Sequence, residues 1–310
     1  MSVTDTAAPA TTLRSRLSRH VSFLAYDNFR FLKIAVAAVV LAIVLYIVVT
    51  PYGERYGGGW AGYTLGTVGA LLIVWLTWFG YRKRTYDPER KYAHPHGAAA
   101  VAVDAHPPED PSRLARRLSA HVYLGLALLI IATLHTGFHF GWNIHTLAYT
   151  LMCIVIFSGI FGVFAYVRYP RLMTENRENL TMAQMQAQVT AIDAELRRRV
   201  LPLDDQMTRI IRDSIDNTPI GGSMWRQVSG HYPDCGTARA IAQLRTRPDG
   251  DQENWRMFRA KLDEKDALVS RLRRDVRFKA LMDVWLYFHV PLTFALLAAL
   301  TAHIISVFYL

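Results

Sequence analysis

Residues 283–310 decide the fold; they read DVWLYFHVPLTFALLAALTAHIISVFYL. A helix of about 20 apolar residues crosses the ~30 Å hydrocarbon core of a bilayer, and this stretch is long enough to do so. It nevertheless contains two histidines, His289 and His303, fourteen residues apart. Fourteen steps of ~100° end about 40° short of four turns, so both side chains face nearly the same way, about 21 Å apart along the axis. The stretch therefore predicts a membrane-spanning helix with one histidine near each leaflet.

A second apolar stretch, residues 118–140, repeats this spacing with His121 and His135. Ionisable side chains within a spanning helix are costly and are functional by default. If both helices run from inside to outside and face each other, His121 and His289 share the inner level. His135 and His303 then share the outer level, so each level offers two opposed imidazoles.

Two opposed imidazoles are the protein ligands of a six-coordinate b-type haem, whose macrocycle supplies the four other nitrogens. The four histidines therefore predict two haems stacked across the bilayer, which form an electron path from one face to the other. The competing interpretation is that they are core histidines hydrogen-bonded between helices. That interpretation suits a single membrane histidine, whereas four histidines at a duplicated spacing favour haem.

Other residues near these pairs give weaker signals. Arg116 and Arg117 lie where the propionates of an inner haem could sit, but basic residues at the inner end of a span explain them equally well. His135 and His139 are four residues apart and could form a metal pair, although no carboxylate or cysteine accompanies them. We favour His139 as an interfacial residue that contacts the outer haem's propionates or a quinone headgroup. His145 lies six residues further on.

The apolar residues of the chain are gathered into runs. The chain has 310 residues, 52% of them hydrophobic, and five runs approach or exceed the length of a span: 31–50, 60–81, 118–140, 146–169 and 283–310. This pattern predicts an all-α integral membrane protein with five transmembrane helices that form a haem-binding bundle. The predicted parts are a tail over 1–30, transmembrane helices 1–4 over 31–170, a helical cytoplasmic insertion over 171–280 and transmembrane helix 5 over 281–310.

The basic residues predict the orientation of these helices. The formal net charge is +10, which we attribute to cytoplasmic loops rather than to nucleic-acid binding. Lys and Arg are abundant in the tail, in residues 82–118 and in residues 171–280, whereas residues 51–59 and 140–146 hold a single Arg. The N-terminus is therefore predicted to be cytoplasmic and the C-terminus to lie outside. The first apolar run lacks a signal-peptide cleavage site, so we expect it to remain as a helix.

The insertion reads as helical. TMAQMQAQVTAIDAELRRRV predicts an amphipathic helix with Thr181 as its N-cap, PLDDQMTRIIRDSI predicts a second helix, and the sequence is helical from Gln252 into the last span. It has neither a GxGxxG nor a Walker sequence, so we interpret it as a docking surface for a partner.

The remaining motifs carry little chemistry. Cys153 and Cys235 are an implausible disulfide pair, and the absence of CxxC disfavours iron–sulfur or zinc ligation by this chain. The second span holds several glycines that suit close helix packing or a flat cofactor, with packing preferred: Gly62, Gly66, Gly69 and Gly80. His94, His96 and His106 fall in a Pro- and Ala-rich stretch that we interpret as a solvated linker. Residues 13–21 suit either an interfacial helix or an irregular tail.

With this histidine pattern, the chain resembles the membrane diheme b-type cytochromes. Its arrangement is similar to the transmembrane domain of ferric reductases and NADPH oxidases, in which haem-ligating pairs lie on the third and fifth helices. The segment HTGFHFGWNIHTLAY, with SGIFGVFAYVRYPRL after it, looks like the cytochrome b subunits of bacterial respiratory oxidoreductases. The resemblance implies two haem b groups whose iron is bound by the pairs His121/His289 and His135/His303.

The resemblance also implies a function. We expect an electron-transfer subunit in the bacterial cytoplasmic membrane, which links a cytoplasmic flavin or iron–sulfur oxidoreductase subunit to the quinone pool or to an external acceptor. No sixth helix and no flavin or nicotinamide domain follows His303, so the expected electron donor or acceptor is a separate subunit. Two alternatives stay open: ferric-reductase-like reduction of an external acceptor at the outer haem, and a non-redox membrane scaffold or transporter.

Overall fold

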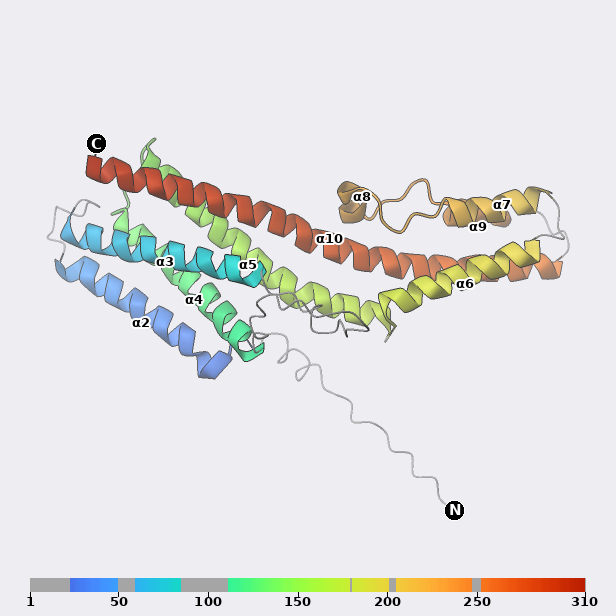
Figure 1. Cartoon of the computed structure of the whole chain (residues 1–310), viewed down its shortest axis with the longest axis horizontal. Coiled ribbons are helices and arrows are strands. Elements are labelled where there is room, and N and C mark those ends of the chain that lie inside the picture. Colours follow the sequence, from blue (N-terminus) through green and yellow to red (C-terminus); the bar gives the residue numbers. More distant parts are fainter. Residues whose placement is uncertain are drawn as a thin grey trace, which may run out of the picture. The chain divides into compact units, whose positions relative to one another are not determined.

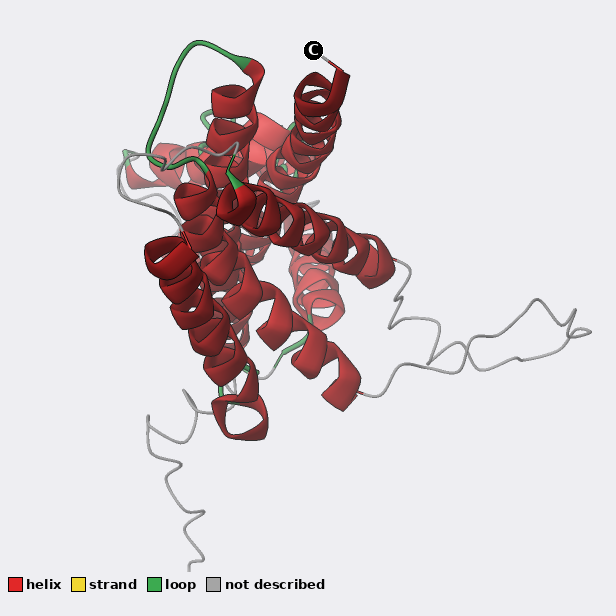
Figure 2. Cartoon of the chain, turned by 90° about the vertical axis from the view of Figure 1, so that its left-hand side faces the viewer, coloured by secondary structure: helices red, strands yellow, loops and turns green. Residues whose placement is uncertain are grey.

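The computed structural model describes residues 23–49, 59–84, 111–178, 180–200, 205–246 and 252–309, and this part of the chain contains helices and no strand (Figure 2). Five helices are long and apolar enough to cross a membrane (Figure 1): α2 (Tyr26–Val49), α3 (Trp60–Arg84), α4 (Pro111–His135), α5 (Ile144–Arg177) and α10 (Gln252–Tyr309). The chain is therefore an all-helical, multi-pass membrane protein by the length and composition of its helices. The predictions for residues 13–21 and for His94, His96 and His106 lie outside the described residues.

The chain divides into two compact units. The first comprises Met1–Phe161 and Phe288–Leu310, and the second comprises Gly162–Tyr287. Helices α5 and α10 run through both units, because each begins or ends in one and continues without interruption into the other. The four predicted ligand histidines all belong to the first unit.

Small and apolar side chains hold the first unit together. Ala35 and Ala42 of α2 are buried in a cluster with Leu65 of α3 and with Ala127 and Ile131 of α4. Ala35 and Ala42 are small, so the backbone of α2 can lie close to α4 at these positions. Among the described helices of this unit, the most extensive close backbone approaches are those of α2 and α3 to α4.

A second cluster in this unit takes one buried side chain from each of four helices: Ile73 of α3, Leu128 of α4, Met152 of α5 and Leu296 of α10. Outside these clusters the spanning helices expose large apolar side chains, such as Leu41 and Val48. Exposed apolar surface of this extent is expected where lipid, rather than water, surrounds the helices.

The loop between α4 and α5 begins earlier than the end of the apolar run suggested. Helix α4 ends at His135 rather than near residue 140, because Gly137 and Phe138 adopt left-handed conformations with φ of 55° and 62°. His139 therefore lies beyond the helix, and its Nδ1 donates a hydrogen bond to the Gly137 carbonyl at 2.8 Å. The alternative in which His135 and His139 form a metal pair at helical spacing is therefore not supported, since α4 ends at His135.

Helix α5 also extends further than predicted. The span was expected to stop at residue 169, but the helix continues through Pro170 to Arg177. Asn143 caps its first turn, because the Oδ1 of Asn143 accepts a hydrogen bond from the Thr146 backbone N–H at 2.9 Å.

The second unit has a core of its own. Its helices include α6 (Met182–Val200), α7 (Asp205–Asp216), α8 (Met224–Ser229) and α9 (Gly236–Arg245), together with parts of α5 and α10. Fully buried apolar side chains come from α6, α7 and α10: Met185, Leu196, Ile211, Phe258, Leu262 and Leu272. The predicted N-cap is confirmed, since Thr181 Oγ1 accepts from the Gln184 N–H at 3.1 Å and Gln184 Oε1 accepts from the Thr181 N–H at 2.8 Å.

Two buried charges in this unit are satisfied within it. Lys265 is 1% exposed and donates to the Ser214 carbonyl at 2.7 Å, and its Nζ lies 2.5 Å from Asp193 Oδ1. Asp275 is 1% exposed, pairs with Arg177 and accepts a hydrogen bond from Asn176 Nδ2 at 3.0 Å. Buried charges without partners would be strongly destabilising, so these contacts indicate a folded polar unit rather than a loose loop.

Candidate functional site

The outer histidine pair predicted from the sequence is brought together in the first unit. His135 is the last residue of α4, and His303 lies in the last two turns of α10. Their ring centroids are 6.0 Å apart, and their planes are inclined at 83°. Both rings are partly buried. Two residues 168 positions apart in the chain therefore lie close together, with their rings in an edge-on arrangement.

His135 is held by helix α3. Its Nδ1 lies 2.8 Å from the Gly62 carbonyl oxygen. A carbonyl only accepts hydrogen bonds, so Nδ1 must carry the proton, and Nε2 of the neutral ring keeps its lone pair. This is the arrangement in which imidazole binds a metal through Nε2 while its other nitrogen is fixed by a hydrogen bond.

Gly66 makes this contact possible. A Cβ atom at position 66 would lie 2.7 Å from Cε1 of His135, which is closer than a side chain can approach. The groove left by the glycine on α3 therefore receives the imidazole and lets it reach the Gly62 carbonyl one turn away. The sequence suggested helix packing or a flat cofactor for these glycines, and the structure places a histidine ring against Gly66.

His303 has a different partner. Its Nδ1 lies 2.5 Å from Nδ1 of His145, and the two ring centroids are 4.6 Å apart with planes at 89°. His145 belongs to the first turn of α5. It was not among the predicted site residues, because sequence spacing alone does not reveal that the start of α5 meets the end of α10.

At the inner level the structure describes the surroundings of His289. Its Nδ1 lies 2.6 Å from the hydroxyl of Ser158, which also contacts the Val155 carbonyl at 2.9 Å. A hydroxyl has one proton, and only the hydroxyl can donate to the carbonyl, so His289 Nδ1 must donate to Ser158. Nε2 of His289 therefore keeps its lone pair, as in His135.

The other inner residues are less constrained. A Cβ atom on Gly159 would lie 3.7 Å from Cε1 of His289, which is ordinary contact. His121 is partly buried on α4, Arg117 is partly buried and Arg116 is exposed. The contacts described for His289 lead to α5, so the pairing of His121 with His289 stays a prediction. The role of the two arginines also stays a prediction.

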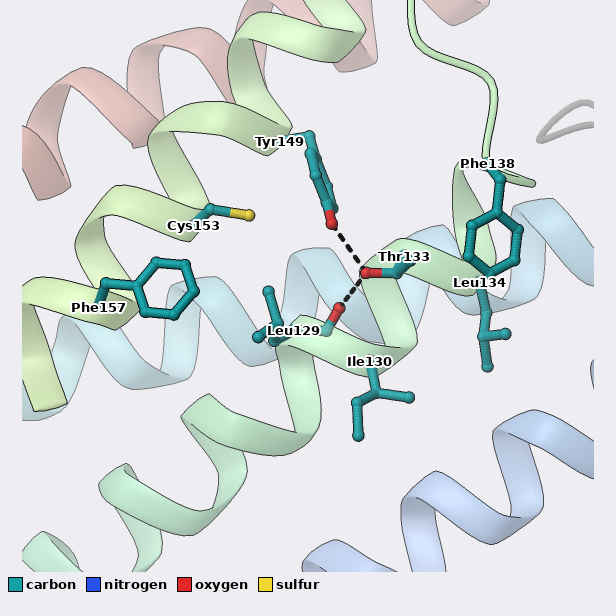
Figure 3. Close-up of a pocket in the computed structure, with 8 residues that line it drawn as sticks. All are labelled: Leu129, Ile130, Thr133, Leu134, Phe138, Tyr149, Cys153 and Phe157. Carbon is teal, nitrogen blue, oxygen red and sulfur yellow. Dashed lines mark hydrogen bonds between the residues drawn. The ribbon is translucent and has the colours of Figure 1, made fainter.

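A cavity of about 420 Å³ lies beside α4 and α5 in the same unit (Figure 3). Six of its eight lining residues are Leu, Ile, Phe or Cys; the other two, Thr133 and Tyr149, are hydrogen-bonded to each other at 2.9 Å. Thr133 donates its only hydroxyl proton to the Leu129 carbonyl at 2.7 Å, so Tyr149 must donate to Thr133. The cavity is therefore apolar, and its two hydroxyl oxygens have lone pairs but no proton left to donate.

Among the described residues, no group of three or more His, Cys, Asp or Glu side chains is arranged to hold a bare metal ion. This finding does not bear on haem, because its macrocycle supplies four nitrogens and the protein supplies only two ligands. Comparisons of the chain with protein-family models, with curated proteins and with solved structures found no match.

Proposed function

We propose that this chain is a diheme cytochrome b membrane subunit that carries electrons across the membrane. In this proposal two haem b groups are held by the axial pairs His121/His289 and His135/His303. The observation that carries the proposal is the geometry of the outer pair. With a metal–nitrogen bond of about 2 Å on each side and ring centres about 1 Å behind those nitrogens, two imidazoles on one metal have centroids about 6 Å apart. His135 and His303 have 6.0 Å.

Two further observations support the fit. His135 and His289 each donate from Nδ1, to Gly62 and to Ser158, so Nε2 is the unprotonated nitrogen of each neutral ring, the form that binds iron. In addition, α10 approaches α4 through side chains such as Leu296 and His303, while the close backbone approaches are among α2, α3 and α4. The backbones of α4 and α10 are thus further apart than those of α2, α3 and α4, and a flat macrocycle between α4 and α10 needs this space.

A bound haem would supply one-electron transfer at iron, and two histidine ligands leave no open position there for oxygen chemistry. The residues of the chain then bind and orient the two groups, and the apolar spans keep water away from them. We assign the chain to the bacterial cytoplasmic membrane, with its N-terminus cytoplasmic and its C-terminus periplasmic. The proposed partner is a flavin or iron–sulfur oxidoreductase subunit on the cytoplasmic side.

The cavity on α4 and α5 favours the quinone pool as the second partner. It is apolar, and it lies at membrane depth with Leu134, the chain neighbour of His135, in its wall. Because the Thr133 and Tyr149 hydroxyls can only accept, they suit the O–H groups of a quinol better than the carbonyls of a quinone. We expect a short-chain quinol to reduce the haems of the purified chain, and Tyr149→Phe to slow that reduction. If a ferric chelate exchanges electrons instead and quinol does not, the external acceptor is the partner.

A reduced-minus-oxidised spectrum with haem quantified per chain tests the proposal. We expect two b-type haems per chain. His135→Ala and His303→Ala should each leave one haem, whereas His231→Ala, a change of an exposed histidine in the second unit, should leave two. A purified chain without reduced-haem absorbance bands would exclude the cytochrome and leave the non-redox scaffold or transporter.

A further inference from the structure

The hydrogen bond between His303 and His145 decides which nitrogen of His303 can bind a metal. The two Nδ1 atoms are 2.5 Å apart, so one of them carries the shared proton and the other accepts it. If His303 donates, its Nε2 keeps the lone pair that a metal requires. If His145 donates, the proton of neutral His303 lies on Nε2, which then cannot bind a metal. In His135 the position of the ring proton is already fixed on Nδ1, because the Gly62 carbonyl can only accept a hydrogen bond.

The position of His145 is fixed by the turn before it. Asn143 Oδ1 accepts from the Thr146 N–H at 2.9 Å, and Thr146 Oγ1 accepts from the Gly141 N–H at 3.1 Å. These two bonds close the loop onto the first turn of α5, where His145 lies. The imidazole of His145 is therefore presented to His303 by a capped helix end rather than by an unconstrained loop.

We propose that His145 is a positioning residue for His303, acting as the hydrogen-bond acceptor for His303 Nδ1–H. This inference rests on the proposed function, in which His303 binds the iron of the outer haem. The acceptor selects the ring form of His303 that has Nε2 free. When Nδ1, the nitrogen that does not bind iron, donates a hydrogen bond, the imidazole also becomes a stronger electron donor to iron. Stronger donation favours the ferric state, so His145 lowers the midpoint potential of the outer haem.

The test uses the purified full chain and three variants. His145→Leu removes the acceptor, and His145→Asn keeps an oxygen near the place of Nδ1. His231→Leu is the control, because His231 is an exposed histidine of the second unit. The readouts are a potentiometric titration of the visible bands and the electron paramagnetic resonance spectrum of the oxidised haems. Neither readout depends on turnover.

In His145→Leu we expect one of the two midpoint potentials to move upward and one ferric low-spin signal to shift, while the other haem is unchanged. His145→Asn should return both readouts toward the parent, and His231→Leu should match the parent. A diheme chain in which His145→Leu changes neither readout overturns this inference alone. So does an equal shift in the Leu and Asn variants, since the acceptor would then be irrelevant. A chain without haem overturns the proposed function and this inference together.

Discussion

Gly66 has no side chain, and this leaves room for the imidazole ring of His135 against α3. The ring lies against Gly66 and bonds the Gly62 carbonyl, so the backbone of α3 serves as the support for a side chain of α4. Glycine on a spanning helix is ordinarily explained by close helix packing. At Gly66 it is the imidazole of His135, rather than a neighbouring backbone, that lies close to the helix. Gly66 is therefore part of the candidate site.

Gly66→Ala should therefore displace His135. The new Cβ would lie 2.7 Å from Cε1 of the ring, so the ring must move and lose the Gly62 carbonyl. We expect the haem content to fall from about two toward one per chain, with the outer haem lost. The measurement is haem quantified per chain in the purified protein.

Gly69→Ala is the matched control on the same helix. Its Cβ would lie 3.7 Å from Leu128 Cδ1, an ordinary contact, so haem content should match the parent. Equal haem content in Gly66→Ala and Gly69→Ala would contradict the role given to Gly66.

In the second unit, Arg177→Met should lower the stability of the fold, because it leaves the buried carboxylate of Asp275 without its arginine partner. Asp275 has a side chain that is 0% exposed and pairs with Arg177, whose side chain is 30% exposed. Removing one partner of a buried pair costs about 3–5 kcal/mol, and partial exposure of the arginine reduces this to about 2–4 kcal/mol. The measurement is the midpoint of urea unfolding in detergent, followed by tryptophan fluorescence.

Arg171→Met provides the comparison for this prediction. Arg171 pairs with Glu175, whose side chain is 51% exposed, at 2.7 Å, and exposed pairs contribute about 0.2–1 kcal/mol. The unfolding midpoint should therefore fall much less than in Arg177→Met. Similar losses in the two variants would show that Asp275 does not depend on its partner.

At the residue scale, the sequence revealed the histidines but not what surrounds them. The repeated fourteen-residue spacing follows from helix geometry and can be read directly. Gly62, His145 and Ser158 could not be read in this way. Their contacts depend on the rotation and height of α3 and α5 relative to α4 and α10, and an apolar span carries little sequence information on either.

At the scale of elements, the five apolar runs were sufficient to predict five long helices, because about 20 apolar residues without turn signals leave few alternatives. Their ends were harder to predict. Helix α4 stops at His135, where Gly137 takes a left-handed conformation, and α5 passes through Pro170. Proline removes a backbone donor and ordinarily kinks or ends a helix, so its position inside α5 could not be expected from the sequence. Helix α9 (Gly236–Arg245) was not predicted.

The register of α10 should be as important as its histidines. Inserting one alanine between Leu297 and Ala298 rotates everything after it by ~100° and shifts it by ~1.5 Å. His303 then turns away from His135, while His289 keeps its bond to Ser158. We expect one haem per chain instead of two, measured by the reduced-minus-oxidised spectrum. The same insertion after Val307 lies beyond both histidines and should leave two haems; a loss of the same size there would contradict the register argument.

At the scale of the whole molecule, the distribution of charge predicts which parts share a side of the membrane. Trp142 lies in the loop between α4 and α5 and is fully exposed, and Trp225 on α8 is 79% exposed. In a background with Cys153 and Cys235 replaced by Ser, Trp142→Cys should react with a membrane-impermeant maleimide in intact cells. Trp225→Cys should react only after lysis. Labelling of both cysteines from one side would contradict the predicted orientation.

The sequence also predicted that the polar stretch between the fourth and fifth spans is helical and distinct from the spans. That prediction was possible because residues 171–280 are rich in charged residues and contain no apolar run long enough to span a membrane. Its internal core was less predictable. The burial of Lys265 and Asp275 depends on partners in α5, α6 and α7, and such partners are distant in the chain.

Helix α10 contains Pro291, two residues after His289 and four residues after Tyr287, where the second unit ends. Proline has no N–H, so the Tyr287 carbonyl lacks its donor within the helix. This turn is therefore the point at which α10 bends most easily. His289 and its bond to Ser158 lie within the turn, while His303 lies more than three turns beyond it. The two histidines of α10 therefore differ in their backbone surroundings, since only His289 lies beside the proline.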